Sequence, residues 1–333
     1  MTHIFSPALR PTAGVVLSAL ACTLFASGCA VEQSDPEPEL LVVAQQGIQG
    51  GYEDDFDHHV VGLVRLSNQG FGACSGTLIA PNVVLTAQHC VASTSTGGGV
   101  QCGLTSFGPP ADPGQFFVTT NMVFTQDAAD YHRVIEVHIP PSETNDFCGH
   151  DQAILILEEP IAETEAIPAV PRVDEPLQAD EEYYAVGFGQ TSDNGPSGQR
   201  RRRDGLFVTC VGEGCGAPQF ITPEEYLGDT GICQGDSGGP AFDLYNRVHG
   251  VASRGSAGCE SPVYGYVQPW GAWIKEVTIY AASLTGSEPP PWATGYPTDP
   301  AFSHPVGGAC VSSCGAGRCL DEYSTRRCTD LAA

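Results

Sequence analysis

Short alternating runs of apolar and polar residues recur along most of this chain, and turn-forming residues separate them. Such alternation is typical of β-strands that bury one face, because successive side chains point to opposite sides of a sheet. Pro81-Asn82 is one of the turn signals between two runs. The pattern predicts strands at residues 58–66, 72–79, 82–87, 133–139, 183–189, 248–255 and 264–267.

Two apolar stretches do not follow the strand pattern. Residues 270–277 predict a helix near the end of the strand-rich region, which packs its tryptophan and isoleucine side chains onto the strands. Residues 13–26 form an apolar run that follows Arg10 and is too short to cross a membrane as a helix. Together with the small residues at its end, this run predicts an export signal over residues 1–28.

The residues after the signal predict a spacer. Cys29 directly follows small residues, which resembles a bacterial lipoprotein signal whose cysteine becomes lipidated; ordinary cleavage near the same point is the alternative. Residues 29–47 are acidic and proline-containing, a composition that is typical of an unstructured spacer or a short propeptide.

Composition narrows the classes of function. The net charge of −25 argues against nucleic acid and anionic membrane surfaces as partners, and is typical of the solvated surface of a secreted protein. Fourteen cysteines in 333 residues indicate an oxidising compartment if they are paired. The protein is therefore expected outside the cell or at the cell surface.

The C-terminal end predicts a small separate module. Residues 285–305 form a proline-rich linker, and residues 306–333 contain four cysteines in a segment too short to bury a core. Two disulfides are expected there, and a zinc site is the alternative, although no histidine lies among these cysteines. The sequence does not identify a partner for this tail.

The strongest chemical signal is Gly-Asp-Ser-Gly-Gly-Pro at residues 235–240. A serine between glycines allows backbone N–H groups to turn toward a substrate carbonyl, which acyl-transfer chemistry requires. Cys233 lies just before this segment and provides a point for a disulfide. A shorter Gly-x-Ser-Gly pattern is often only a turn, but the longer segment is specific.

This segment resembles the serine segment of the trypsin/chymotrypsin family of serine endopeptidases, and three further segments support the resemblance. Residues 75–90 resemble the family's histidine segment, residues 151–157 its aspartate segment, and residues 48–51 its mature N-terminus. The chain order His89, Asp151, Ser237 is also that of chymotrypsin. The resemblance covers residues 48–284.

The resemblance implies an all-β fold of two packed six-stranded antiparallel Greek-key β-barrels with a C-terminal helix, followed here by the small cysteine-rich tail. It implies that Ser237 is the nucleophile, His89 the general base and Asp151 the group that orients His89. The N–H groups of Gly235 and Ser237 would form the oxyanion hole. This chemistry requires no cofactor and no metal, and its substrates are proteins or peptides.

The resemblance also assigns substrate-binding positions, which are Gly231, Ile232, Gln234, Ser253 and Gly255. Gly231 takes the place at the floor of the primary pocket where trypsins carry an aspartate. A buried lysine or arginine would have no partner there, so the expected preference is a small or medium apolar residue before the cut bond. Glu260 provides an alternative, because a carboxylate turned into the pocket would favour lysine or arginine.

Two further features follow from the resemblance. The freed α-amine of Ile48 would pair with Asp236 after cleavage of the propeptide, although Gln46-Gly47 is not the site that a trypsin-like activator cuts. The family pairs Cys74 with Cys90 and Cys233 with Cys259. Cys102 and Cys148 have no family counterpart, and by elimination they are expected to pair with each other, whereas Cys210 and Cys215 lie close together in the sequence and predict a local loop.

The sequence therefore predicts a secreted or lipid-anchored bacterial serine endopeptidase. The first alternative is a catalytically inactive binding protein on the same fold, but such relatives typically lose one of the three catalytic residues. The second alternative is a serine esterase, which the chain order disfavours.

Overall fold

The structure, a computed structural model, describes residues 47–67, 70–96, 99–191, 195–217, 220–256, 259–295, 317–322 and 325–330. The expected signal at residues 1–28, nearly all of the spacer, and much of the linker and tail lie outside these residues. In the tail, β17 (Gly317–Glu322) and β18 (Thr325–Asp330) pair as an antiparallel hairpin. No helix in the described ranges is long and apolar enough to cross a membrane.

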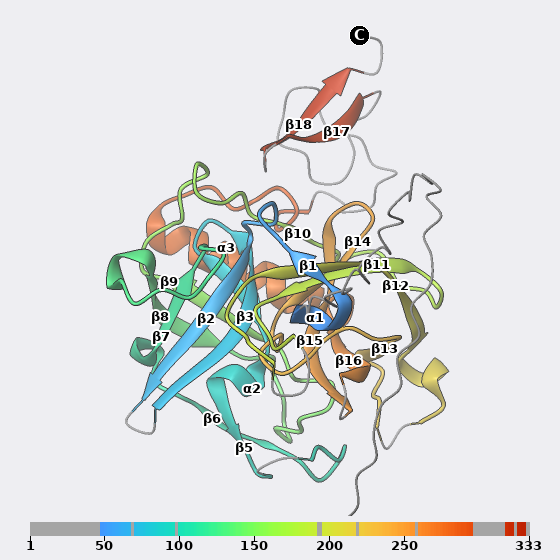
Figure 1. The fold of residues 1–333 in the computed structure, drawn as a ribbon. Helices are drawn as coiled ribbons and strands as arrows, with labels where there is room; N and C mark the ends of the chain where they lie inside the picture. Colours follow the sequence, from blue (N-terminus) through green and yellow to red (C-terminus); the bar gives the residue numbers. More distant parts are fainter. Residues whose placement is uncertain are drawn as a thin grey trace, which may run out of the picture. The chain divides into compact units, whose positions relative to one another are not determined.

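The N-terminal half forms a closed six-stranded barrel in the order β2-β3-β4-β9-β8-β7 (Figure 1). Its strands are β2 (Val60–Ser67), β3 (Gly70–Ala80), β4 (Val83–Thr86), β7 (Phe116–Thr119), β8 (His132–His138) and β9 (Ala153–Leu157). Every residue of β4 and β9 is buried, because the barrel core covers one face and neighbouring elements cover the other.

The C-terminal half closes a second ring of six strands, because β12 pairs with β13 at the ends of the order β12-β11-β14-β15-β16-β13. Its strands are β11 (Glu182–Gly187), β12 (Arg201–Val211), β13 (Glu225–Gly228), β14 (Pro240–Asp243), β15 (Arg247–Ser256) and β16 (Glu260–Tyr266). Two short strands add to it: β1 (Tyr52–Glu53) pairs with β12, and β10 (Val170–Pro171) with β15. The expected fold of two six-stranded barrels is confirmed.

The expected helix is present as α3 (Gly271–Thr285). Ile274 is fully buried, and Trp270 and Trp273 pack against the core. The apolar face continues through Val277 and Ala281, so the helix runs farther than residue 277. The Asn82 amide donates to the carbonyl of Ala281 over 3.0 Å, which fixes the helix to the N-terminal barrel.

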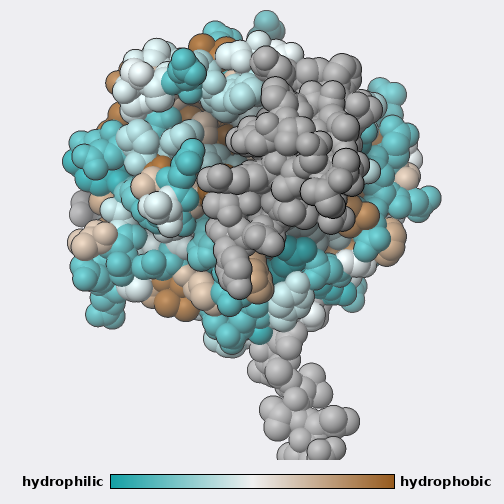
Figure 2. Space-filling model, turned by 90° about the horizontal axis from the view of Figure 1, so that it is seen from above, coloured by the Kyte–Doolittle hydropathy of each residue, from teal (hydrophilic) through white to brown (hydrophobic). Residues whose placement is uncertain are grey.

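The remaining elements are short. The helices α1 (Gly47–Gly50) and α2 (Gln88–Val91) have one turn each, and β5 (Ala92–Thr94) pairs with β6 (Phe107–Pro110). Single 3₁₀ turns occur at residues 113–115, 128–130, 212–215 and 268–270. The residues that carry colour in Figure 2 are mostly hydrophilic, with scattered hydrophobic ones.

Arginines in the run at residues 200–203 bind the segment that follows Ile48, the N-terminus expected after cleavage. Arg200 is fully buried; its Nε donates to Asp54 over 3.0 Å and its Nη1 donates to the carbonyls of Val60 and Thr120. Arg202 donates to Asp57 over 3.0 Å. Residues 201–203 lie at the start of β12, and Arg200, just before it, is buried because it ties the acidic segment 53–57 to both barrels.

Among the described residues, four disulfides link Cys74 to Cys90, Cys102 to Cys148, Cys210 to Cys215, and Cys233 to Cys259. The first closes the β3–β4 hairpin onto α2, which carries His89. The second braces the loop that leads to Asp151. Two of the four disulfides therefore constrain the chain on either side of the candidate site.

Candidate active site

Asp151 connects the two barrels at the candidate site. It is 1% exposed and accepts three hydrogen bonds. The backbone N–H of His89 donates to Oδ1 over 2.8 Å, His89 Nδ1 lies 2.8 Å from Oδ2, and the hydroxyl of Ser253 donates to Oδ2 over 2.6 Å. His89 belongs to the first barrel and Ser253 to the second, so this buried carboxylate needs both barrels to be satisfied.

This arrangement fixes the tautomer of His89. Because Nδ1 faces a carboxylate acceptor, it carries the proton, and Nε2 is left as the acceptor. Burial lowers the pKa of His89, and so does the charge of Arg254. The charge and hydrogen bond of Asp151 outweigh them, so the pKa lies above its ordinary value of 6.5.

Backbone contacts fix the position of Ser237. The N–H of Ser75 on β3 donates to the carbonyl of Ser237 over 2.8 Å. A Cβ at Gly238, where φ is +81°, would lie 2.1 Å from the hydroxyl of Thr86 and 2.3 Å from the carbonyl of Ser75. Only glycine fits there, and this close contact brings the serine segment against the strand that leads to His89.

Both packing and the backbone conformation require glycine at position 235. Its φ is +99°, and a Cβ would lie 2.9 Å from the Cα of Gly189. In the described part of the chain, the N–H groups of Gly235 and Ser237 donate to no protein acceptor. The Ser237 hydroxyl likewise makes no hydrogen bond to His89 there, as is common in ligand-free active sites. Two backbone donors beside the serine remain available.

The edge of β15 beyond the serine segment is open. β14 pairs with β15 as far as Val251, and Gly238 then donates to the carbonyl of Ala252. Beyond this point, residues 253–255 pair with no strand on that side in the described chain. An extended peptide can therefore add to this edge.

The residues expected to form the primary pocket pack against the C-terminal barrel. Gly231 has φ +116°, and a Cβ there would lie 3.5 Å from the side chains of Leu206 and Arg203. Ile232 is 7% exposed and packs in the core of the C-terminal barrel. Gln234 joins this segment to Gly189-Gln190, because its carbonyl accepts from Gln190 N–H over 2.7 Å. Glu260, the alternative pocket carboxylate, is exposed.

Asp236 is 1% exposed and has no cationic partner among the described residues. It accepts from the N–H groups of Gly189 and Cys233 over 2.7 and 2.8 Å. Burial raises its pKa to about 7, although both hydrogen bonds lower it. Ile48, its expected partner, is fully buried and packs in the same core cluster as Ile232, but here it remains peptide-bonded to Gly47.

Sequence reasoning did not identify three residues that contact the site: Phe147, Glu225 and Arg254. Phe147 stacks on the His89 ring at 6.1 Å, and Arg254 forms an ion pair with Glu225. Arg254 lies on a strand that also carries the polar residues Arg247 and His249, so the pattern of this strand did not single it out. Nothing in the sequence pointed to Glu225 or Phe147 as its contacts.

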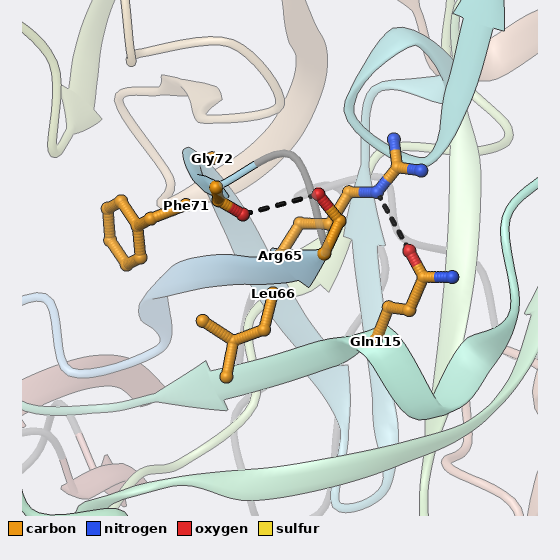
Figure 3. A pocket seen from close by; sticks show the side chains of 7 residues that line it. Arg65, Leu66, Phe71, Gly72 and Gln115 are labelled. Carbon is orange, nitrogen blue, oxygen red and sulfur yellow. Dashed lines mark hydrogen bonds between the residues drawn. The ribbon is translucent and has the colours of Figure 1, made fainter.

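Two other hollows lie on the N-terminal barrel. One of about 590 Å³ is lined by Arg65, Leu66, Phe71 and Gln115, among others, and Arg65 donates to Gln115 over 3.3 Å (Figure 3). Its neighbour of about 730 Å³ is mostly apolar and shares Leu66 and Phe71. Neither hollow brings a nucleophile together with a base, so the arrangement suited to acyl transfer is the one around Asp151.

Comparison with known proteins agrees with this geometry. The family model described as trypsin matches residues 48–274. The chain is 28% identical to a trypsin of Saccharopolyspora erythraea over 65% of this chain and 89% of that protein. It is 29% identical to chymotrypsin-C of Mus musculus over 61% and 77%, respectively. It is 27% identical to chymotrypsin-like elastase family member 1 of Rattus norvegicus, over 63% of this chain and 80% of that protein.

The isolation of Asp236 predicts a pH dependence for the uncleaved protein. Between about pH 4 and 7 the folded protein holds a proton on Asp236 that the unfolded chain has released, because the pKa rises from 3.8 to about 7 on folding. Stability should therefore fall as pH rises through this window. Asp236→Asn should remove this part of the slope.

The measurement is urea denaturation at several pH values, with both proteins carrying Ser237→Ala to prevent self-digestion. Other carboxyl groups titrate in both proteins, so the difference between the two curves isolates Asp236. Parallel curves across the window would contradict the raised pKa.

Proposed function

Because the chain belongs to the trypsin family of serine proteases, we propose that it is an endopeptidase that hydrolyses peptide bonds through Ser237, His89 and Asp151. One observation supports this most: the buried Asp151 receives His89 Nδ1 over 2.8 Å, beside an intact Gly-Asp-Ser-Gly-Gly-Pro segment. An inactive binding protein would have no need to keep this costly burial of a charge.

The reaction would proceed in two stages. Nε2 of His89 takes the proton of Ser237 as its Oγ attacks the substrate carbonyl, and then donates it to the leaving amine. Asp151 stabilises the imidazolium that forms between these steps. The free N–H groups of Gly235 and Ser237 bind the oxyanion, and water then hydrolyses the acyl-enzyme by the same steps. No metal or cofactor enters this scheme.

We propose further that the protein acts outside the cell, as its disulfides and its trypsin relatives suggest. The export signal at residues 1–28 and lipidation of Cys29 remain part of this proposal, as do the linker at residues 285–305 and the tail module at 306–333. Pairing of the new Ile48 amine with Asp236 would give the buried carboxylate the cation it lacks.

First, removal of the nucleophile or the base should remove activity. Ser237→Ala and His89→Ala should each lower kcat/KM by several orders of magnitude while the protein still folds. For the parent protein, kcat/KM should rise with pH as His89 loses its proton, with a midpoint above 6.5 because the pKa of His89 is raised. Equal turnover by purified Ser237→Ala protein would disprove the assignment.

Second, cleavage at Gly47–Ile48 should activate the enzyme. The uncleaved protein should be weakly active, because a buried Asp236 without a cation does not order the neighbouring oxyanion donors. N-terminal sequencing of active material should start at Ile48. As the control, Asp236→Asn should be cleaved normally but gain little activity. Full activity in protein that retains residues 30–47 would contradict this proposal.

Third, the preferred residue before the cut bond should be small or medium and apolar. Gly231 supplies no carboxylate to a buried lysine or arginine, and Glu260 is exposed. Peptides that differ only at that residue should give the highest kcat/KM for alanine, valine or leucine. A preference for arginine or lysine that disappears in Glu260→Gln would show that the alternative holds.

A further inference from the structure

A buried ion pair lies directly behind the active site. Glu225 begins β13 and its side chain is fully buried. Arg254 on β15 meets it with both arms of the guanidinium, Nη1 to Oε1 at 2.6 Å and Nη2 to Oε2 at 2.9 Å. A forked pair of this kind fixes the plane of the guanidinium as well as its position. Arg254 therefore has one defined orientation.

On one side, this orientation determines which way the hydroxyl of Ser253 points. Arg254 Nη1 donates to Ser253 Oγ over 3.3 Å. A serine hydroxyl has a single proton, so accepting from Arg254 leaves that proton for Asp151 Oδ2 at 2.6 Å. Arg254 thus acts on the carboxylate that holds His89.

On the other side, Arg254 reaches the loop that covers His89. Its guanidinium lies 5.7 Å from the ring centroid of Phe147, and Nη2 lies 3.6 Å from the sulfur of Cys148. Phe147 is 3% exposed and stacks on His89 at 6.1 Å with the planes 21° apart. The attraction between a cation and a ring face holds Phe147 in this place. Arg254 thus acts on His89 by a second route.

We propose that Arg254, held by Glu225, is a positioning residue for His89 that joins the second barrel to the Cys102–Cys148 loop of the first. It does not touch the reacting atoms. It orients His89 through Ser253 and Asp151 from one side and through Phe147 from the other. This role rests on the proposed peptidase function, since its consequence is the placement and basicity of the catalytic base.

The charge of Arg254 also acts on His89. Among the described residues, the charged groups that influence the imidazole are Asp151, which favours its protonation, and Arg254, which opposes it. The buried Glu225 pairs with Arg254 and offsets its positive charge on the side of the barrel interior. Loss of the Arg254 charge should therefore make His89 more basic, whereas a purely structural role would leave its titration unchanged.

The test compares four variants with the parent: Arg254→Met, Arg254→Lys, the double variant Glu225→Gln/Arg254→Met, and the control Arg133→Met. The double variant is included because Arg254→Met leaves the buried Glu225 without its cation and can fail to fold. Arg133 pairs with Glu158 on the surface, where both side chains are about half exposed. Arg133→Met therefore also removes an arginine–glutamate ion pair, but one that lies away from the site.

Two readouts are measured as a function of pH. The first is kcat/KM, and the second is the proton resonance of the His89 ring in proteins that also carry Ser237→Ala. The double variant should lose about 10- to 100-fold in kcat/KM, as expected for a displaced base. The acidic limb of its kcat/KM profile and the titration of its His89 ring should both move to higher pH. Arg254→Lys should keep the parental titration but not the parental rate, and Arg133→Met should match the parent in both.

Parental kinetics and a parental ring titration in the folded double variant would overturn the proposal. In the double variant, a lower rate with an unchanged ring titration would also overturn the proposal, because that result means that Arg254 acts through packing alone. If the parent hydrolyses no peptide at any pH, the proposed function fails, but the ring titration still decides whether Arg254 acts on His89.

Discussion

The structure depends on one buried carboxylate that neither barrel can satisfy alone. Asp151 accepts from the backbone and the ring of His89 in the first barrel and from Ser253 in the second. Removing a buried charge from its donors costs several kcal/mol. The two barrels are therefore held at the position where a histidine base, a serine segment and an open strand edge meet.

The second constraint is steric, because the serine segment needs glycine at positions where any side chain would clash. Gly235 and Gly238 have positive φ angles and lie so close to neighbouring backbone or side chains that a Cβ would overlap them. This packing turns the serine segment and leaves two N–H groups that donate to no acceptor among the residues that the structure describes. The short motif is specific because each of its glycines answers a separate steric requirement.

Much of this architecture was predictable from the sequence. Alternating patterns located seven of the twelve barrel strands within a few residues, since a strand with one buried face requires that alternation. The three segments with His89, Asp151 and Ser237 could be recognised because the chemistry restricts their immediate neighbours. The end of α3 was missed, although its apolar face continues through Val277 and Ala281.

The contacts that surround the site were not predictable in the same way. Glu225 and Arg254 lie 29 residues apart on different strands, and Asp54 and Arg200 lie 146 apart. Such pairs form only once the barrels close, so no local pattern encodes them. Phe147 reaches His89 because a disulfide between two cysteines without family counterparts shapes its loop.

The central claim is that this geometry activates Ser237 as a nucleophile, and a fluorophosphonate tests it most directly. Protein that begins at Ile48 should gain the mass of one phosphonyl group per chain, and peptide mapping should place it on Ser237. Correctly folded protein with the four disulfides described here that gains no adduct, or gains it on another residue, would contradict the account.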